Sequence, residues 1–139
     1  MIIFCDGVFD MFHYGHINHF KQIKDLYPES YLIVGVLSDK LATDYKRKPI
    51  LNEFKRAELV KSCRYVNKVT CDFPLIMTEN FIKENNIDLV VHAFSNKMDL
   101  DKQLEFFAVP IKLDKFKILD YDNSISTTAI INNLKVDNN

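Results

Sequence analysis

The sequence has no tryptophan and only three cysteines in 139 residues. Cys5, Cys63 and Cys71 are odd in number and widely spaced, and no C-x-x-C pair occurs. The cysteine pattern therefore supports neither a zinc site nor a disulfide framework. We interpret the three side chains as reduced thiols of an intracellular protein and expect a cytoplasmic location.

Long apolar runs and an excess of charge of one sign are also lacking. The first run, residues 1–5, is too short for a signal peptide or a membrane span, and Asp6 interrupts it. A net charge of −1 creates no strong field toward nucleic acid or anionic lipid. We therefore expect no nucleic-acid partner and no membrane span. The hydrophobic share of 47% is enough to form the core of one compact domain over residues 1–139.

Short apolar runs alternate with stretches of helical spacing along the whole chain. Strands are predicted at 2–5, 31–37, 66–70, 88–92 and 116–119, and helices at 17–26, 52–63, 78–85, 100–107 and 126–134. This alternation predicts an α/β, doubly wound fold with a five-stranded parallel sheet and helices on both faces. In such a sheet, ligands bind beyond the carboxyl ends of the strands, where the strand order reverses.

The stretch "GVFDMFHYGH", residues 7–16, directly follows the first predicted strand and places His13 and His16 around Gly15. Unpaired amides at a helix start favour an anion, and two imidazoles add donors for phosphate oxygens. The pattern predicts a phosphate site suited to a charge-rich transition state. A metal site with Asp10 as a third ligand is an alternative, although the spacing differs from H-E-x-x-H and no helix is expected across Gly15. Simple packing of the two histidines is the other alternative.

Three stretches together resemble the cytidylyltransferases that act on phosphocholine, phosphoethanolamine and glycerol 3-phosphate. "GVFDMFHYGH" is similar to their H-x-G-H signature. "RKPILNEFKRAELVKSCRYVNKV", residues 47–69, is similar to a segment built around asparagine-glutamate, an arginine and C-R-Y-V-D-E-V. "SISTTAI", residues 124–130, is similar to the closing G-I-S-T-T element. The three matches follow the family order and spacing and cover nearly the whole chain.

The resemblance implies a Rossmann-like domain that transfers a cytidylyl group from CTP, with Mg²⁺, to a small phosphomonoester and releases pyrophosphate. The attacking phosphate is already an anion, so the protein has to position the reactants and stabilise charge. The resemblance also implies a C2 homodimer through "KSCRYVNKV", with Lys61, Arg64 and Tyr65 at the interface.

Site residues follow from the same resemblance, position by position. The implied catalytic residues are His13, His16, Lys46 and Asp10. The implied nucleotide-binding residues are Gly7, Val8, Phe9, Gly15, Arg56, His92, Ser124, Ile125, Ser126, Thr127 and Thr128, and no protein ligand to a metal is assigned. Taken alone, the residues leave other roles open: a loop cap for Asp10, solvated charges for Lys46 and Arg56, a core histidine at 92 and helix caps at 126–128. Asn18 and His19 are expected on a helix surface without a role.

Departures from the family pattern keep two other functions open. Residues 121–124 replace the family's R-T-E-G, so an arginine is missing and Asp122 stands beside the expected phosphate site; the nearest substitutes are Lys115 and Lys117. Leu75 replaces a tryptophan and Ala93-Phe94 replaces an aspartate pair, which weakens an aromatic cage for phosphocholine. An adenylyltransferase that uses ATP, and a degenerate nucleotide-binding or regulatory protein with little turnover, are the alternatives.

Overall fold

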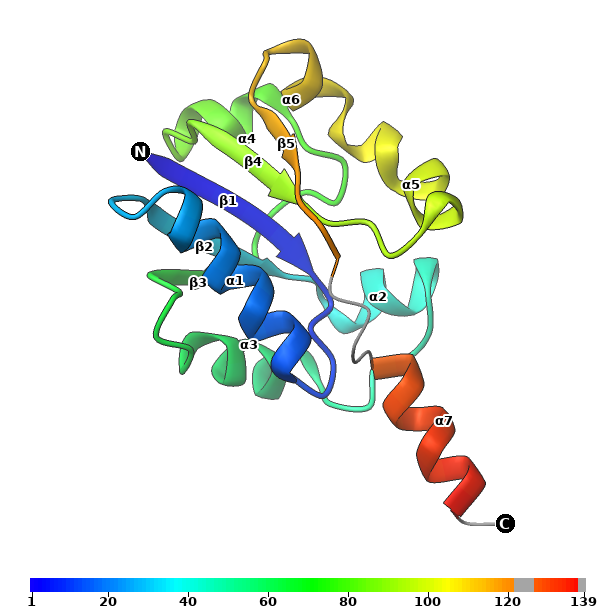
Figure 1. The fold of residues 1–139 in the computed structure, drawn as a ribbon. Coiled ribbons are helices and arrows are strands. Elements are labelled where there is room, and N and C mark those ends of the chain that lie inside the picture. The colour runs from blue at the N-terminus through cyan, green and yellow to red at the C-terminus, as the bar shows by residue number, and fades with distance from the viewer. Residues whose placement is uncertain (122–126, 138–139) are drawn as a thin grey trace.

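A five-stranded, all-parallel sheet forms the centre of the fold in the computed structural model, which describes residues 1–121 and 127–137 (Figure 1). The strand order is β3-β2-β1-β4-β5. The strands are β1 (Ile2–Gly7), β2 (Tyr31–Val36), β3 (Lys68–Thr70), β4 (Leu89–His92) and β5 (Phe116–Ile118). The α-helices are α1 (Tyr14–Leu26), α2 (Asp39–Tyr45), α3 (Glu53–Lys61), α4 (Glu79–Glu84), α5 (Lys97–Gln103), α6 (Ala108–Lys112) and α7 (Thr127–Asp137). The predicted fold class is confirmed.

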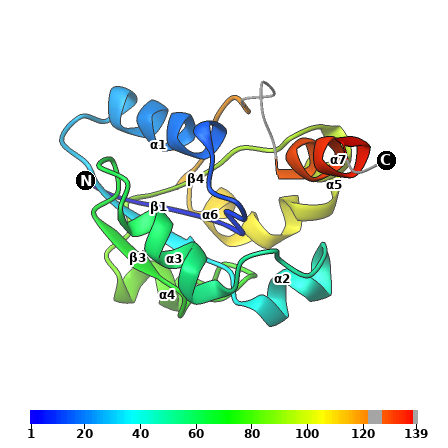
Figure 2. The same cartoon turned by 90° about the horizontal axis from the view of Figure 1, so that it is seen from below.

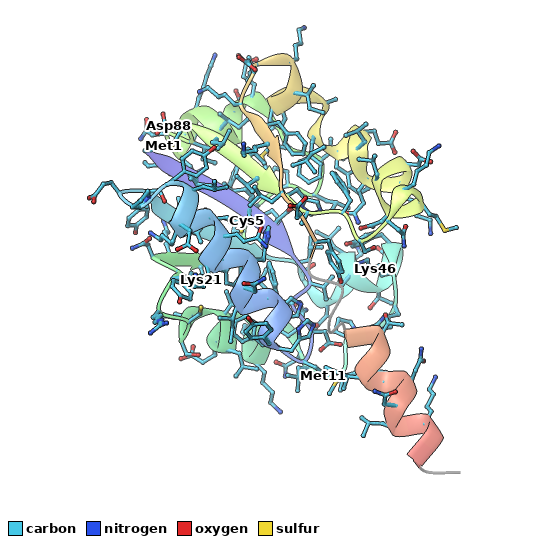
Figure 3. The ribbon with its side chains drawn as sticks, viewed as in Figure 1. Met1, Cys5, Met11, Lys21, Lys46 and Asp88 are labelled. Carbon is cyan, nitrogen blue, oxygen red and sulfur yellow. The ribbon has the colours of Figure 1, made fainter. Side chains whose placement is uncertain are left out.

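Helices bury both faces of the sheet, because alternate residues of each strand point to opposite sides. Cys5 of β1 packs in one core with Phe20 and Ile23 of α1 (Figure 3). Phe4, its neighbour in the strand, packs in a second core with Ile82 of α4. In Figure 2, α1 and α4 accordingly lie on opposite sides of β1. This two-sided burial explains why the central strands read as continuous apolar runs.

The helices predicted at 52–63 and 78–85 begin at residues that cap the first turn of α3 and α4. Asn52 and Thr78 cap α3 and α4, each accepting a hydrogen bond from a backbone N–H three residues later. Helix α2 was not predicted; it has seven residues, of which Ala42 is buried, and Ser38 caps it. The single helix predicted at 100–107 is instead α5, a 3₁₀ turn at Leu104–Phe107, and then α6.

The strand order reverses between β1 and β4. From β1 the chain adds β2 and β3 on one side, and β4 and β5 then form on the other side of β1. The loops after Gly7 and after His92 therefore leave the same edge of the sheet at its switch point, where ligands of such folds bind. None of the helices in the described part of the chain is both long and apolar enough to cross a membrane.

Candidate functional site

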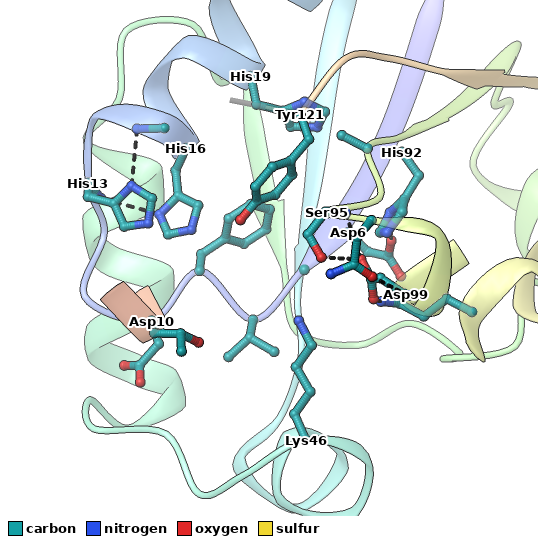
Figure 4. A pocket seen from close by; sticks show the side chains of 18 of the residues that line it. Asp6, Asp10, His13, His16, His19, Lys46, His92, Ser95, Asp99 and Tyr121 are labelled. Carbon is teal, nitrogen blue, oxygen red and sulfur yellow. Dashed lines mark hydrogen bonds and ion pairs between the residues drawn. The ribbon is translucent and has the colours of Figure 1, made fainter. Parts of the chain in front are cut away.

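A cavity of about 460 Å³ opens at this carboxyl edge, a volume within the usual range for small-molecule sites (Figure 4). The loop after β1, the first turns of α1, the end of α2, the loop after β4 and α5 all contribute to its walls. Of the predicted site residues, those that line it are Gly7, Val8, Phe9, Asp10, His13, Gly15, His16, Lys46, His92 and Thr128. Thr127 begins α7, whereas Ser124, Ile125 and Ser126, together with Asp122, lie outside the described residues.

The loop that follows β1 has a strained backbone. Phe9 and Met11 have φ angles of 54° and 49°, in the left-handed region that non-glycine residues rarely adopt. A Cβ at Gly7 would lie 2.9 Å from the buried ring of Phe9, so this position requires glycine. The two left-handed residues turn the loop tightly beside the cavity, and surrounding contacts have to hold this conformation in place.

His13 and His16 form a reciprocal cap at the start of α1. His13 Nδ1 accepts a hydrogen bond from the N–H of Gly15 at 3.0 Å, and His16 Nδ1 accepts one from the N–H of His13 at 3.2 Å. The two imidazole rings stack with their centroids 3.8 Å apart. The helix consequently begins at Tyr14 and runs through Gly15, so the expectation that no helix crosses this glycine is wrong.

These hydrogen bonds decide where the imidazole protons lie. A ring nitrogen that accepts a hydrogen bond carries no proton, so the neutral rings of His13 and His16 are protonated at Nε2. Burial, followed by the charges of His13, His19 and Lys46, lowers the pKa of His16 to about 3. At neutral pH, His16 is therefore an uncharged N–H donor at the N-terminus of a helix. This arrangement suits phosphate oxygens.

Asp10 lines the cavity and also makes the hydrogen bonds expected of a loop cap. Its carboxylate, only 4% exposed, accepts hydrogen bonds from the backbone N–H groups of Ile50 at 2.7 Å, Leu51 at 2.9 Å and Met11 at 3.1 Å. Asp10 thus ties the loop after β1 to the loop after α2. The metal alternative gains no support, because the described residues bring together no group of three or more histidine, cysteine or carboxylate side chains.

Arg56 occupies neither of its predicted positions: it does not line the cavity, and it is 0% exposed. Its guanidinium donates to the carbonyls of Leu51, Val8 and Leu37 at 2.8–2.9 Å and pairs with Asp39 at 2.8 Å. Val8 lines the cavity and lies on the strained loop after β1. Arg56 therefore stabilises this loop from the side that faces away from the cavity.

Two cations lie at the end of α2. Lys46 points into the cavity in Figure 4. Desolvation lowers the pKa of its ammonium group, while the charge of Asp99 raises it. Arg47, which sequence reasoning missed, also lines the cavity and donates to Thr128 Oγ1 at 3.1 Å. The available signals were its position beside Lys46 and its place at the start of the family-like stretch at 47–69.

The substitutes expected for the missing family arginine lie elsewhere. Lys115 and Lys117 do not line the cavity, and Lys115 Nζ donates to the carbonyl of Ile87 at 3.2 Å. Arg47 instead brings a guanidinium to the part of the cavity beside the first turn of α7, through its hydrogen bond to Thr128.

The wall of the cavity that faces His13 is acidic, because Asp6 and Asp99 line it. Asp6, 7% exposed, has its Oδ1 atom 3.3 Å from His92 Nδ1, but this oxygen has no hydrogen-bond partner within the described residues. Asp99 accepts from Ser95 and from the side-chain amide of Gln103. Burial and the charges of Asp6 and Asp99 raise the pKa of Tyr45. Figure 4 shows His92, Asp6, Ser95 and Asp99 gathered on this side, across the cavity from His13.

His19 also lines the cavity, although it was expected on a helix surface without a role. Burial, and then the charge of His92, lowers its pKa to about 4. The available signal was the spacing: His13, His16 and His19 follow one another at intervals of three residues, and such residues share a helix face.

The sequence model of the family described as "Cytidylyltransferase-like" matches residues 4–133. Choline-phosphate cytidylyltransferase A of Rattus norvegicus is 43% identical over 90 residues, which are 65% of this chain and 24% of that protein. A protein named probable ethanolamine-phosphate cytidylyltransferase, from Encephalitozoon cuniculi, is 35% identical over 136 residues, 98% of this chain and 41% of that protein. The chain thus spans less than half the length of these curated relatives.

A solved structure shares the fold. The lipopolysaccharide core biosynthesis protein of Thermoplasma volcanium GSS1 superposes with a TM-score of 0.64 at 25% sequence identity. The match covers 88% of this chain and 96% of that one.

Proposed function

The chain belongs to the cytidylyltransferase-like family, and from this premise we propose that it transfers a cytidylyl group from CTP to a small phosphomonoester, with release of pyrophosphate. The observation that carries the proposal is the pair of stacked imidazoles at the N-terminus of α1, where the cap occupies both Nδ1 atoms and so leaves the protons on Nε2. The names of the relatives support the choice of CTP as the donor.

The chemistry requires charge stabilisation rather than a strong base. An oxygen of the phosphomonoester forms a new bond to the α-phosphorus of CTP, and the bond from that phosphorus to the bridging oxygen of the leaving pyrophosphate breaks. His13 and His16 donate hydrogen bonds to the phosphate oxygens on which charge collects. Lys46 and Arg47 neutralise the triphosphate from the other side of the opening.

We propose that Mg²⁺ enters with the nucleotide rather than in a protein cage. Among the described residues there is no three-ligand cluster, and the Asp10 carboxylate already accepts three backbone hydrogen bonds. Mg²⁺ commonly keeps several waters and binds substrate phosphates with one or two carboxylates. Such an ion would neutralise part of the triphosphate charge.

The acidic wall favours an acceptor that carries an ammonium group. Asp6, Asp99 and Asp120 all line the cavity, and Asp6 Oδ1 has no hydrogen-bond partner within the described residues. Carboxylates along one wall of a cavity attract a cation through their charge, even where a single oxygen such as Asp6 Oδ1 is shielded from solvent. Phosphoethanolamine therefore fits better than glycerol 3-phosphate, and its small ammonium needs no aromatic cage.

The predicted C2 dimer stays a proposal. Arg64 donates to the hydroxyl of Tyr65 at 2.7 Å, and its guanidinium lies 4.9 Å from the centre of that ring. Arg64 and Lys61 are exposed, so the three implied interface residues form a partly open surface that a second copy of the chain would cover.

The function is tested by measuring pyrophosphate release with Mg²⁺, each of CTP and ATP, and phosphoethanolamine, phosphocholine or glycerol 3-phosphate as acceptor. We expect release with CTP, fastest with phosphoethanolamine, and a rate at least about 100-fold lower for Lys46→Ala, which removes a cation beside the transferred group. Release only with ATP would place the protein among adenylyltransferases. CTP binding without release from any acceptor would support the degenerate alternative.

A further inference from the structure

His19 has two ring nitrogens in different surroundings. Nδ1 is shielded from solvent and has no hydrogen-bond partner within the described residues. Nε2 is not among the shielded, unpartnered atoms, and His19 lines the cavity, so Nε2 is the ring atom open to a ligand. Because a buried N–H without an acceptor is the costlier state, the proton of the neutral ring belongs on Nε2.

The position of His19 relative to His16 suggests which ligand group it meets. Three residues of α-helix advance about 4.5 Å along the axis, on the same face. A phosphate held at His19 would therefore lie next to one held by His13 and His16. In-line transfer requires the attacking phosphate oxygen to approach within about 3–3.5 Å of the α-phosphorus, so two neighbouring phosphate positions are needed.

The neighbours of His19 indicate the acceptor side of the cavity. The charge of His92 acts on His19, and His92 lies against Asp6 on the acidic wall. In Figure 4 His19 lies beside Tyr121, at the opposite end of the cavity from Lys46. His19 thus stands between the imidazoles that face the triphosphate and the carboxylate that suits the acceptor's ammonium group.

We propose that His19 is a further substrate-binding residue, whose Nε2–H donates a hydrogen bond to the phosphate of the phosphomonoester acceptor. This inference rests on the proposed cytidylyl transfer and assigns one more residue to it. The imidazole recognises the phosphate without adding charge, which leaves the cavity's cations to the triphosphate.

Two substitutions of His19 distinguish the contribution of Nε2 to acceptor binding from that of Nδ1. The amide nitrogen of glutamine reaches about as far as Nε2, whereas the shorter asparagine reaches only the place of Nδ1. We expect His19→Asn to raise the KM for phosphoethanolamine about tenfold or more, with the KM for CTP changed less than about twofold, because a hydrogen bond to a charged group is lost. His19→Gln should stay within about threefold of the wild-type KM. Thermal melting establishes that both variants are folded.

Three results would overturn the inference: equal defects in both variants, wild-type KM values in both, or a parallel loss of CTP affinity. Failure of the proposed function looks different, because the wild-type protein would then form no product from CTP and phosphoethanolamine. In that case calorimetric titration with phosphoethanolamine still tests His19. Weaker binding to the His19→Asn variant alone supports a phosphate contact, and unchanged binding overturns it.

Discussion

Replacing His16 by asparagine is expected to lower kcat about 10²–10³-fold, the cost of removing one preorganised donor from a developing charge. The carbonyl oxygen of asparagine can stand where Nδ1 stands and accept the hydrogen bond from the N–H of His13. Nothing in the shorter side chain replaces the Nε2–H group. The variant therefore keeps the cap of α1 and loses the imidazole ring, with the donor that faces the cavity and the stacking on His13.

The measurement is the single-turnover rate with saturating CTP, accompanied by circular dichroism and thermal melting. Lys21→Ala is the matched control on the same helix, because Lys21 is exposed and its ammonium pairs with Asp25 at 2.7 Å, away from the cavity (Figure 3). We expect a wild-type rate for this control. A folded His16→Asn variant with kcat within about threefold of wild type would refute the role of His16 as a donor.

Replacing Arg56 by methionine is expected to reduce the free energy of unfolding by about 3–5 kcal/mol, the usual cost of breaking a buried charged network. The guanidinium is 0% exposed and makes four hydrogen bonds. Methionine fills much of the space but leaves the carbonyls of Leu51, Val8 and Leu37 without their donor. Each unsatisfied buried carbonyl costs about 1–3 kcal/mol. Water that reaches some of these carbonyls after local relaxation keeps the total below the simple sum.

Urea unfolding followed by circular dichroism measures this loss. Asp39→Asn is the control, because it removes the ion pair with Arg56 and leaves the bonds to the carbonyls. We expect it to lower the free energy of unfolding by about 1 kcal/mol or less, since the Asp39 side chain is 43% exposed. An Arg56→Met variant within about 1 kcal/mol of wild type would mean that the hydrogen bonds from Arg56 to the carbonyls of Leu51, Val8 and Leu37 do not stabilise the fold. Equal losses in both variants would also count against the carbonyl network.

Sequence patterns predicted the central strands well because these strands are buried on both faces. The runs at 2–5 and 31–37 correspond to β1 and β2, and their neighbourhood in the sheet follows from the alternation of strand and helix. The helix predicted at 52–63 corresponds to α3, which Asn52 caps. The sequence did not predict the short helix α2, because seven residues with one buried position produce no clear hydrophobic periodicity.

Reasoning from the residues alone predicted the part of the site that is adjacent in the chain, whereas Lys46, His92 and Thr128, which also line the cavity, were expected only from the family resemblance. His13, Gly15 and His16 form a local motif, and the structure places all three at the cavity. Arg56 was predicted to bind nucleotide or to be a solvated charge, because two of the carbonyls that bury it are remote in the chain: Val8 lies 48 positions away and Leu37 lies 19 positions away. The roles of Asp10 and His19 likewise depend on segments that come together only in the folded chain.

The most direct test of the site is nitrogen-15 NMR of the histidine rings as a function of pH, with and without CTP and Mg²⁺. Between pH 5 and pH 8 we expect His16 to remain neutral and protonated at Nε2, since its pKa is lowered to about 3. Addition of CTP should shift the Nε2 resonances of His13 and His16. A His16 ring that titrates near pH 6.5, or Nε2 resonances that do not respond to CTP, would contradict a phosphate site built from uncharged imidazole donors.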